Sequence, residues 1–183
     1  LVRGGHKISG FDPNADARTA LETKGAVCVE SLQALVNTLP APRVVWLMVP
    51  SGKITDDTVN ALLPMLAPGD TVIDGGNSNY KDTLRRAALY AAKGLGYVDT
   101  GTSGGVWGFD RAYCMMIGGE PEDVKRLGRG FRTLAPGFGE LERTPGGDVS
   151  GTAEQGYLHV GPNGAVHFVK RVQTGIGYGL KAA

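Results

Sequence analysis

The sequence predicts an α/β protein with a doubly wound, mostly parallel sheet of the Rossmann type. Short apolar runs alternate with amphipathic helical segments along most of the chain, as in parallel strands joined by helices. Two of the runs end abruptly in small residues: Asp74 is followed by Gly-Gly-Asn-Ser, and Asp99 by Thr-Gly-Thr-Ser-Gly-Gly. Strand ends of this kind form the ligand crevice of an open α/β sheet. We therefore expect a small-molecule site where these two strands end.

The N-terminal segment follows the order of a dinucleotide-binding fold. Residues 1–6 are expected to end a helix at a glycine stop, and residues 7–12 to form a strand. In that fold these are the first helix and the second strand, so the first strand and its G-x-G-x-x-G turn would lie before Leu1. Three further elements are expected next: a polar helix over 15–23, a short strand over 25–29, and a helix over 31–37 that Ser31 caps.

The rest of the chain continues the alternation. Residues 43–49, RVVWLMV, are continuously apolar and are expected to form a strand covered on both faces. Residues 138–155 are glycine-rich and lack periodicity, which indicates a loop. The remaining expected elements are strands at 71–74, 96–100, 113–117 and 157–160, and helices at 56–66, 79–93, 122–134 and from 164 onward.

Composition limits the classes of protein. The 183 residues fit one ordinary domain, and a hydrophobic share of 42% suffices for a core. Nineteen Lys and Arg against 18 Asp and Glu give no reason to expect nucleic acid or an anionic membrane as a partner. No apolar run reaches the roughly 18 residues of a membrane helix, and no secretory signal is present. Cys28 and Cys114 lack metal-ligand spacing and are expected to be buried thiols in a reducing cytoplasm.

Four motifs, in order, resemble those of the decarboxylating 6-phosphogluconate dehydrogenases and, more broadly, of the β-hydroxyacid dehydrogenases. DGGNSNY, GTSGGVWG and MIGG are similar to the strand-end and substrate-loop motifs of that family. GPNGAVHFVKRV is similar to the segment that carries the catalytic lysine. The resemblance covers nearly the whole chain. It implies an NAD(P)-binding domain over residues 1–163 and the start of an all-helical domain over 164–183.

The resemblance also implies an activity and partners. The reaction would be the oxidative decarboxylation of 6-phosphogluconate to ribulose 5-phosphate, in the pentose phosphate pathway, with NAD or NADP as the hydride acceptor. The substrate would be a small phosphorylated sugar acid, and full-length relatives would be homo-oligomers. The histidines His6, His159 and His167 are too scattered to indicate a metal site, and a 3-keto acid loses CO₂ without one.

Several residues are candidates for cofactor binding. Asp12 ends the second strand, where a carboxylate accepts hydrogen bonds from the adenosine ribose and repels a 2′-phosphate, so it favours NAD. The alternative is that Asp12 or Asn14 caps the next helix. The resemblance places Asn77 between nicotinamide and substrate. It also places the main chain of three residues along the cofactor: Leu47, Met48 and Val49.

The substrate loop and the catalytic lysine follow from the same resemblance. Ser103, Gly104 and Gly105 match the loop that binds the sugar-acid carboxylate, and their successive N–H groups suit an anion. Lys170 would be the general base, which requires a depressed pKa. The alternative for Lys170 is an ordinary surface lysine on an amphipathic helix. Trp107 is interpreted as a packing residue.

The last helix departs from the family pattern K-x-V-H-N-G-I-E-Y-G. This chain has Gln173 for the histidine, Thr174 for the asparagine and Gly177 for the glutamate, whereas Tyr178 matches a substrate-phosphate tyrosine. Gln173 and Thr174 can still hydrogen-bond a sugar acid, but Gly177 cannot protonate the enediol, which makes turnover doubtful. Two alternatives therefore stay open: a dehydrogenase of a smaller acid such as 3-hydroxyisobutyrate, and an inactive nucleotide-binding fragment.

Overall fold

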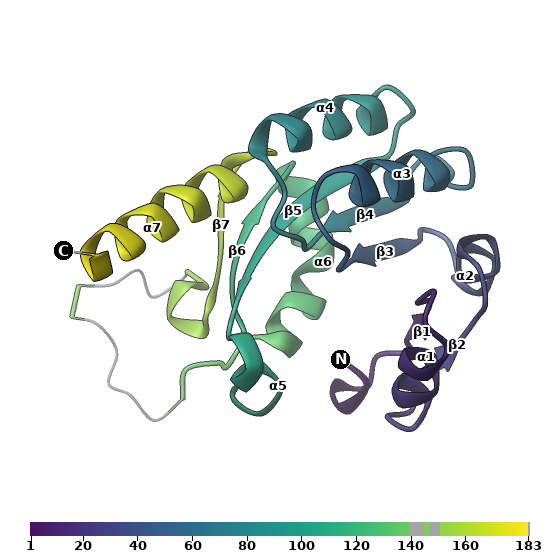
Figure 1. Cartoon of the computed structure of the whole chain (residues 1–183), viewed down its shortest axis with the longest axis horizontal. Helices are drawn as coiled ribbons and strands as arrows, with labels where there is room; N and C mark the ends of the chain where they lie inside the picture. The colour runs from purple at the N-terminus through teal and green to yellow at the C-terminus, as the bar shows by residue number, and fades with distance from the viewer. Residues whose placement is uncertain (140–144, 147–150, 183) are drawn as a thin grey trace.

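The computed structural model describes residues 1–139, 145–146 and 151–182 and has two separate β-sheets (Figure 1). The larger sheet has the strand order β3-β4-β5-β6-β7, and all neighbours are parallel except β5 and β6. Its strands are β3 (Val44–Leu47), β4 (Thr71–Asp74), β5 (Gly96–Ser103), β6 (Cys114–Gly118) and β7 (Tyr157–Gly161). The smaller sheet pairs β1 (Ser9–Gly10) with β2 (Val27–Cys28) in parallel. The predicted doubly wound, mostly parallel fold is confirmed.

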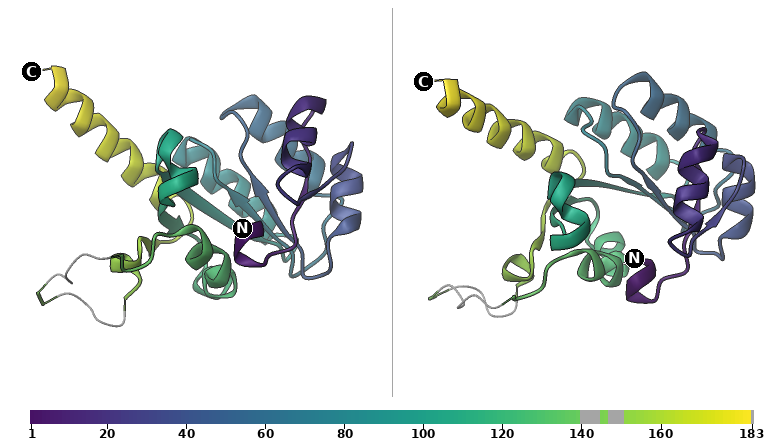
Figure 2. Two further views of the ribbon diagram at one scale, coloured as in Figure 1. Left: turned by 90° about the horizontal axis from the view of Figure 1, so that it is seen from below. Right: turned by 60° about the horizontal axis from the view of Figure 1, so that its bottom comes forward.

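Helices cover both faces of the larger sheet (Figures 1 and 2). The longer helices are α1 (Ala15–Glu22), α2 (Leu32–Thr38), α3 (Lys53–Leu62), α4 (Tyr80–Ala91), α6 (Pro121–Leu134) and α7 (Ala165–Ala182). Short helical turns are η1 (Val2–Gly4), η2 (Gly105–Trp107), α5 (Gly108–Arg111) and η3 (Ala153–Gln155). The described residues contain no helix that is both long and apolar enough to cross a membrane.

The strand pleat divides the core into two layers. On β4, Val72 packs with residues of α2, α3 and α4, whereas its neighbour Ile73 packs with residues of α6. Successive strand side chains point to opposite faces, so a strand between two helical layers must be apolar at consecutive positions. All four residues of β4 are buried, including the polar Thr71 and Asp74 at its ends.

Side-chain caps begin the helices where the sequence indicated. Asn14 accepts a hydrogen bond from the N–H of Asp16 at the start of α1, and Ser31 accepts one from Ala34 at the start of α2. Asn79 accepts one from the N–H of Lys81 and starts α4. The residue before it, Ser78, is therefore available for another role.

Four expectations need correction or restriction. The strand at residues 43–49 is shorter than expected, and its first residue, Val44, is 38% exposed, although Val45 and Trp46 pack in the layers on opposite faces of the sheet. Neither thiol is fully buried: Cys28 is half-buried and Cys114 exposed. Trp107 is 63% exposed and lies beside the Arg111 guanidinium instead of packing in the core. Much of the loop expected at residues 138–155 lies outside the described residues; within it, Ala153–Gln155 forms one 3-10 turn.

A groove of about 1220 Å³ separates the two sheets. Its lining includes Ile8, just before β1 of the smaller sheet, Gly10, at the end of β1, and Val45 and Leu47 on β3 of the larger sheet. β1 pairs only with β2, and β3 pairs only with β4, so each strand presents one unpaired edge to this groove. The second and fourth strands of a dinucleotide-binding order thus face each other across an open slot, as the sequence predicts.

Candidate functional site

Lys170 on α7 connects the ends of two neighbouring strands. Its Nζ donates to Oδ1 of Asn77, in the loop after β4, at 2.7 Å. It also donates to the main-chain oxygen of Thr102, near the end of β5, at 3.3 Å. Asn77 and Thr102 lie 93 and 68 positions before Lys170 in the sequence. The fold thus brings the three residues together at the carboxyl edge of the sheet.

A glycine on β5 allows α7 to approach closely enough for these contacts. A Cβ on Gly101 would lie 2.8 Å from Cγ1 of Val166 and 3.4 Å from Cδ of Lys170. Separations below 3.0 Å force a neighbour to move, and the nearer neighbour here is a buried core residue. The glycine in GTSGG therefore determines how deeply the lysine is seated.

The two glycines after Asp74 have a packing role. A Cβ on Gly75 would collide with the side chains of Trp46 and Met48, and one on Gly76 would lie 3.0 Å from the main-chain oxygen of Val49. The loop after β4 therefore packs tightly against the end of β3.

A buried charge network stabilises the same loop from beneath. Ser78 Oγ donates to Oδ2 of Asp74 at 2.7 Å, and the guanidinium of Arg86 lies 3.3 Å from that oxygen. Arg86 also donates from Nε to Asp56 at 2.8 Å, and Tyr97 donates its hydroxyl to Asp74 at 3.2 Å. Burial raises the pKa of Tyr97, so its hydroxyl remains a donor. With Asp74 and Arg86 both fully buried, each charge depends on the other.

A second buried carboxylate anchors the start of α7. Asp99, on β5, accepts a hydrogen bond from the N–H of Gly164 at 2.9 Å. Burial raises the pKa of Asp99, and its Oδ2 has no partner among the described residues. Next to it, Asn163 donates to the main-chain oxygen of Tyr97 at 2.5 Å. These contacts join the helix that carries Lys170 to the central strand.

The environment of Lys170 suits a proton acceptor. Burial of the amine lowers the pKa of Lys170, because desolvation disfavours the charged form. A neutral amine has two N–H groups and one lone pair. The contacts to Asn77 and Thr102 use the two N–H groups, which leaves the lone pair free to accept a proton.

The candidate cofactor residues lie along the groove between the sheets. Asp12 is exposed, and its carboxylate accepts from the N–H of Asn14 at 2.8 Å, while Asn14 itself caps α1. At the end of β3, Leu47 is 5% exposed, Met48 is 65% exposed and Val49 is half-buried. Four of the five candidates line the groove: Asp12, Leu47, Met48 and Val49. The fifth, Asn77, lies at the contact with Lys170.

The remaining candidate substrate residues surround Lys170 less closely. Ser103, Gly104 and Gly105 are exposed directly after Thr102, and Gly105 has a φ of 51°, a left-handed conformation that favours glycine. Three more candidates lie further along α7 and are exposed: Gln173, Thr174 and Tyr178. Across the part of the chain that the structure describes, none of these three side chains hydrogen-bonds another residue of the site.

Several contributing residues escaped sequence reasoning. Thr83, Arg86 and Tyr90 are buried and fall at helical spacing on the inner face of α4. The sequence did offer one signal for Arg86: it lies on the buried face of α4, and a buried charge requires a partner. His167 is buried and lies three residues before Lys170 on α7, among apolar residues that gave no hint of its contacts.

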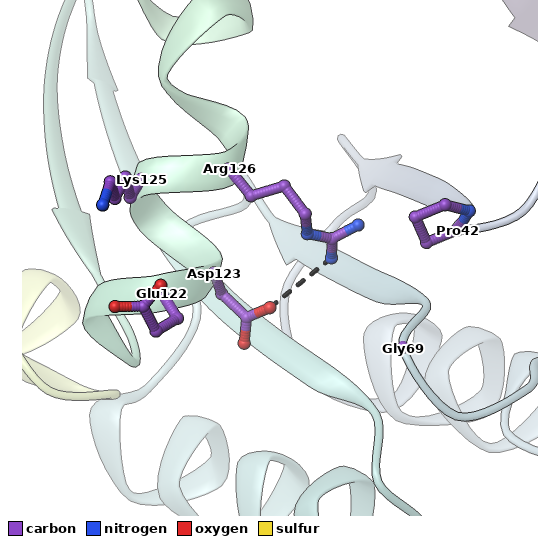
Figure 3. A pocket seen from close by; sticks show the side chains of 6 residues that line it. All are labelled: Pro42, Gly69, Glu122, Asp123, Lys125 and Arg126. Atoms are coloured by element: carbon purple, nitrogen blue, oxygen red, sulfur yellow. Dashed lines mark hydrogen bonds and ion pairs between the residues drawn. The ribbon is translucent and has the colours of Figure 1, made fainter.

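A smaller hollow of about 540 Å³ lies near the start of β4 (Figure 3). Its lining is Pro42, Gly69, Glu122, Asp123, Lys125 and Arg126. Arg126 points toward Asp123 at 3.5 Å, and both also hydrogen-bond the hydroxyl of Thr71, the first residue of β4. Since Thr71 begins the strand and Asp74 ends it, this hollow is at the opposite edge from Lys170, and Asp123 and Arg126 are paired with each other. The described residues contain no group of three or more His, Cys, Asp or Glu that could hold a metal ion.

The fold and the polar carboxyl edge define a Rossmann-like dinucleotide-binding domain. The chain belongs to the 6-phosphogluconate dehydrogenase family: the family model described as the NAD binding domain of 6-phosphogluconate dehydrogenase matches residues 1–141. It is 36% identical over 183 residues to the NAD(+)-dependent, decarboxylating 6-phosphogluconate dehydrogenase of Haloferax volcanii. That alignment covers 100% of this chain but 55% of the relative, so the chain spans little more than half of its length.

Solved structures show the same fold at lower identity. The 6-phosphogluconate dehydrogenase of Plasmodium falciparum superimposes with a TM-score of 0.82 at 24% identity, over 97% of this chain and 36% of that one. A 3-hydroxyisobutyrate dehydrogenase of Mycobacterium tuberculosis superimposes with a TM-score of 0.76 at 24% identity, over 92% of this chain and 51% of that one. The shared architecture therefore includes dehydrogenases of two kinds of hydroxy acid.

Proposed function

We propose that this protein is an oxidoreductase that oxidises and decarboxylates 6-phosphogluconate to ribulose 5-phosphate, with NAD or NADP as hydride acceptor. One observation carries the proposal: Lys170 is half-buried, has a lowered pKa and contacts Asn77 where β4 and β5 end. The site lies where an open α/β sheet places its ligands. The 36% identity to a decarboxylating relative over the whole chain supports the choice of substrate.

In this reaction Lys170 acts as the general base. Its lone pair takes the proton from the hydroxyl on C3 as the hydride leaves that carbon, and the nicotinamide cofactor, when bound, accepts the hydride. Because Asn77 Oδ1 accepts from Lys170, its amide nitrogen is free to donate to the substrate or to the cofactor. The resulting 3-keto group then accepts the electron pair of the carbon–carboxylate bond as CO₂ departs.

Enediol protonation is the weak step in this chain. Position 177, where the family resemblance implies a glutamate, is a glycine on α7. Loss of a positioned acid lowers a rate by roughly 10²–10⁴-fold. We therefore expect the 183-residue chain to show negligible turnover, and Gly177→Glu to raise whatever rate is measured. Robust NAD reduction by the unaltered chain would contradict this expectation.

The groove between the sheets fits a nicotinamide dinucleotide. Asp12 after β1 and residues 48–50 after β3 line its carboxyl end, giving one carboxylate acceptor and an apolar wall. Asp12, Leu47, Met48, Val49 and Asn77 would hold the cofactor, and the carboxylate of Asp12 favours NAD over NADP. Asp12→Ser should reduce the preference for NAD, measured as the ratio of the two dissociation constants. An unchanged ratio would mean that Asp12 does not select the cofactor and only accepts the hydrogen bond from Asn14.

The substrate acid would extend from the loop after β5 along α7. Ser103, Gly104 and Gly105 would bind the carboxylate and hydroxyls through their N–H groups. Gln173, Thr174 and Tyr178 would face the sugar and its phosphate, from a segment over residues 164–183 that we propose to be the start of a helical domain. In support, the C-terminal turns of α7 extend away from the sheet (Figure 2).

A protection experiment tests the substrate directly on this chain. 6-Phosphogluconate should slow the reaction of Lys170 with an amine reagent at least several-fold in the presence of NAD, read by mass spectrometry of the labelled peptide. Exposed Lys53 provides the internal control. Protection by 3-hydroxyisobutyrate alone would support a dehydrogenase of smaller acids, whose fold is the same. Protection by neither acid, with NAD still binding, would indicate a nucleotide-binding fragment.

A further inference from the structure

His167 is a buried side chain that joins α7 to the loop after β4. It is 2% exposed and lies one helical turn before Lys170. Its Nε2 is 3.0 Å from the main-chain oxygen of Gly76, and its Nδ1 is 2.8 Å from the hydroxyl of Thr83 on α4. One imidazole therefore bridges three elements behind the candidate site.

The partners of His167 determine its tautomer. A carbonyl oxygen only accepts, so the nitrogen that faces Gly76 must carry the proton. In the neutral ring the other nitrogen then accepts the hydroxyl proton of Thr83. That hydroxyl also lies 3.2 Å from the main-chain oxygen of Asn79, but it has one proton and the contact to His167 is shorter. The carbonyl of Gly76 thus fixes the ring with Nε2 protonated, and the hydroxyl of Thr83 donates to Nδ1.

Gly76 immediately precedes Asn77 and is fixed on three sides. Its N–H donates to Oδ1 of Asp74 at 3.1 Å, its oxygen accepts from His167, and its Cα packs on the main chain of Val49. The backbone of Asn77 therefore starts from an anchored peptide. Its side chain is nevertheless exposed, and the only hydrogen bond to it among the described residues comes from Lys170.

We propose that His167 is a positioning residue for the Lys170–Asn77 pair. The same turn of α7 holds both partners: Lys170 directly, and Asn77 through the hydrogen bond from His167 to Gly76. The 2.7 Å contact between amine and amide is thereby set by one rigid segment and not by two independent ones. This inference rests on the proposed function only in assigning chemistry to Lys170 and Asn77.

Matched substitutions distinguish positioning from simple packing. His167→Gln keeps a donor near the Nε2 position, whereas His167→Leu fills the space without one. Hydrogen exchange at the amide of Gly76, which donates to Oδ1 of Asp74, should accelerate roughly ten-fold or more in His167→Leu, because the buried hydrogen bond to the Gly76 oxygen is lost. In His167→Gln it should remain within about three-fold of the unaltered protein. Substitution of exposed Arg171 by Gln should change nothing.

The amine provides a second measurement. In His167→Leu the rate at which Lys170 reacts with an amine reagent should change several-fold, and His167→Gln should restore it. Equal exchange at Gly76 in the Leu and Gln variants, or no change in the Leu variant, would overturn the proposal. Neither measurement requires turnover, so a failed 6-phosphogluconate protection experiment would refute the proposed function and leave this inference standing.

A variant that retains the histidine covers the case in which His167→Leu does not fold. Imidazole ¹⁵N chemical shifts should show His167 with Nε2 protonated in the unaltered chain. Thr83→Val removes the hydrogen bond to Nδ1, which should shift the Nδ1 resonance and, by loosening the ring, accelerate exchange at the amide of Gly76. A ring protonated on Nδ1 in the unaltered chain, or Thr83→Val without effect on either signal, would contradict the proposal.

Discussion

The loop after β4 and the groove beside β1 both lie at candidate ligand positions, but they are stabilised very differently. The loop is tied by a buried ion pair, a buried imidazole and close glycine contacts. The groove is bounded on one side by a two-stranded sheet whose connecting helix, α1, has no buried residue. The substrate side of the site is thus organised in advance, whereas the cofactor side has few interior contacts.

The contrast indicates where local stability is concentrated. Rigid constellations require side chains held by packing and by further hydrogen bonds. Lys170 is half-buried and makes a second hydrogen bond to Thr102, and Asn77 follows the anchored peptide of Gly76. Segments with few buried apolar contacts open at low cost in free energy. We therefore expect perturbations of the five-stranded sheet to be costly and those of the two-stranded sheet to be mild.

Loss of Arg86 should have the largest effect. Arg86→Met leaves the buried carboxylate of Asp74 without its cation, which should lower the free energy of unfolding by about 3–5 kcal/mol. The control is Arg85→Met, because Arg85 binds the same Asp56 but is 49% exposed, so its loss should cost at most about 1 kcal/mol. Chemical denaturation measures both. Equal losses would mean that the buried network does not stabilise the loop.

A pair of identical substitutions compares the two sheets directly. Val72→Ala empties part of the core, since Val72 is 0% exposed, and should cost about 2–3 kcal/mol. Val27→Ala in the two-stranded sheet should stay within about 0.5 kcal/mol, because that side chain is 62% exposed. Hydrogen exchange should likewise be slower in β4 than in β2. Similar values in both sheets would remove the contrast.

Gly101→Ala tests the approach of α7 to β5. The added methyl group would meet Val166 at 2.8 Å, so the helix must move, at a cost of about 1–3 kcal/mol. A displaced helix exposes the amine, which should bring the pKa of Lys170 back up toward its ordinary value, as read by NMR titration. Gly175→Ala on α7 has open space and should stabilise the helix by up to about 1 kcal/mol. An unchanged pKa would show that the glycine does not seat the lysine.

The smallest expected effect is a change in pH dependence at Asp99. Burial raises the pKa of Asp99, so the folded state holds this proton more tightly than the unfolded state. The associated stability is present in acid and is lost as pH rises from the ordinary carboxyl value, about 3.9, through the raised one. Asp99→Asn keeps an oxygen acceptor for Gly164. The free energy of unfolding of Asp99→Asn, relative to that of the unaltered chain, should therefore rise between these two pKa values, by up to about 1.4 kcal/mol per pH unit.

Denaturation at a series of pH values measures this difference. A difference in stability that is constant with pH would mean that Asp99 titrates normally.

Much of the architecture was predictable because each element has a local cause. Apolar runs bounded by glycine gave the strands, and Asn14, Ser31 and Asn79 gave the helix starts. Where prediction failed, the cause was a neighbour distant in sequence. Val44, the first residue of β3, is 38% exposed, and no property of its own segment shows that.

For the site, the resemblance supplied the candidate residues but not their arrangement. Lys170 and Asn77 were predicted separately, and their 2.7 Å contact depends on Gly101 allowing α7 onto β5. His167 was considered only as a metal ligand, because a histidine among apolar residues does not show what its ring nitrogens bind. Its partners lie 84 and 91 positions earlier in the chain.

The sequence by itself determined the alternation of strands and helices, the caps and the identity of the polar residues that end β4 and β5, since these depend on short-range preferences and periodicity. Only the tertiary structure decided which of those polar groups meet, which charges are buried and which strand has a free edge. The physical reason is that burial and hydrogen bonding depend on distances between segments far apart in the chain, and close packing against particular glycines sets those distances.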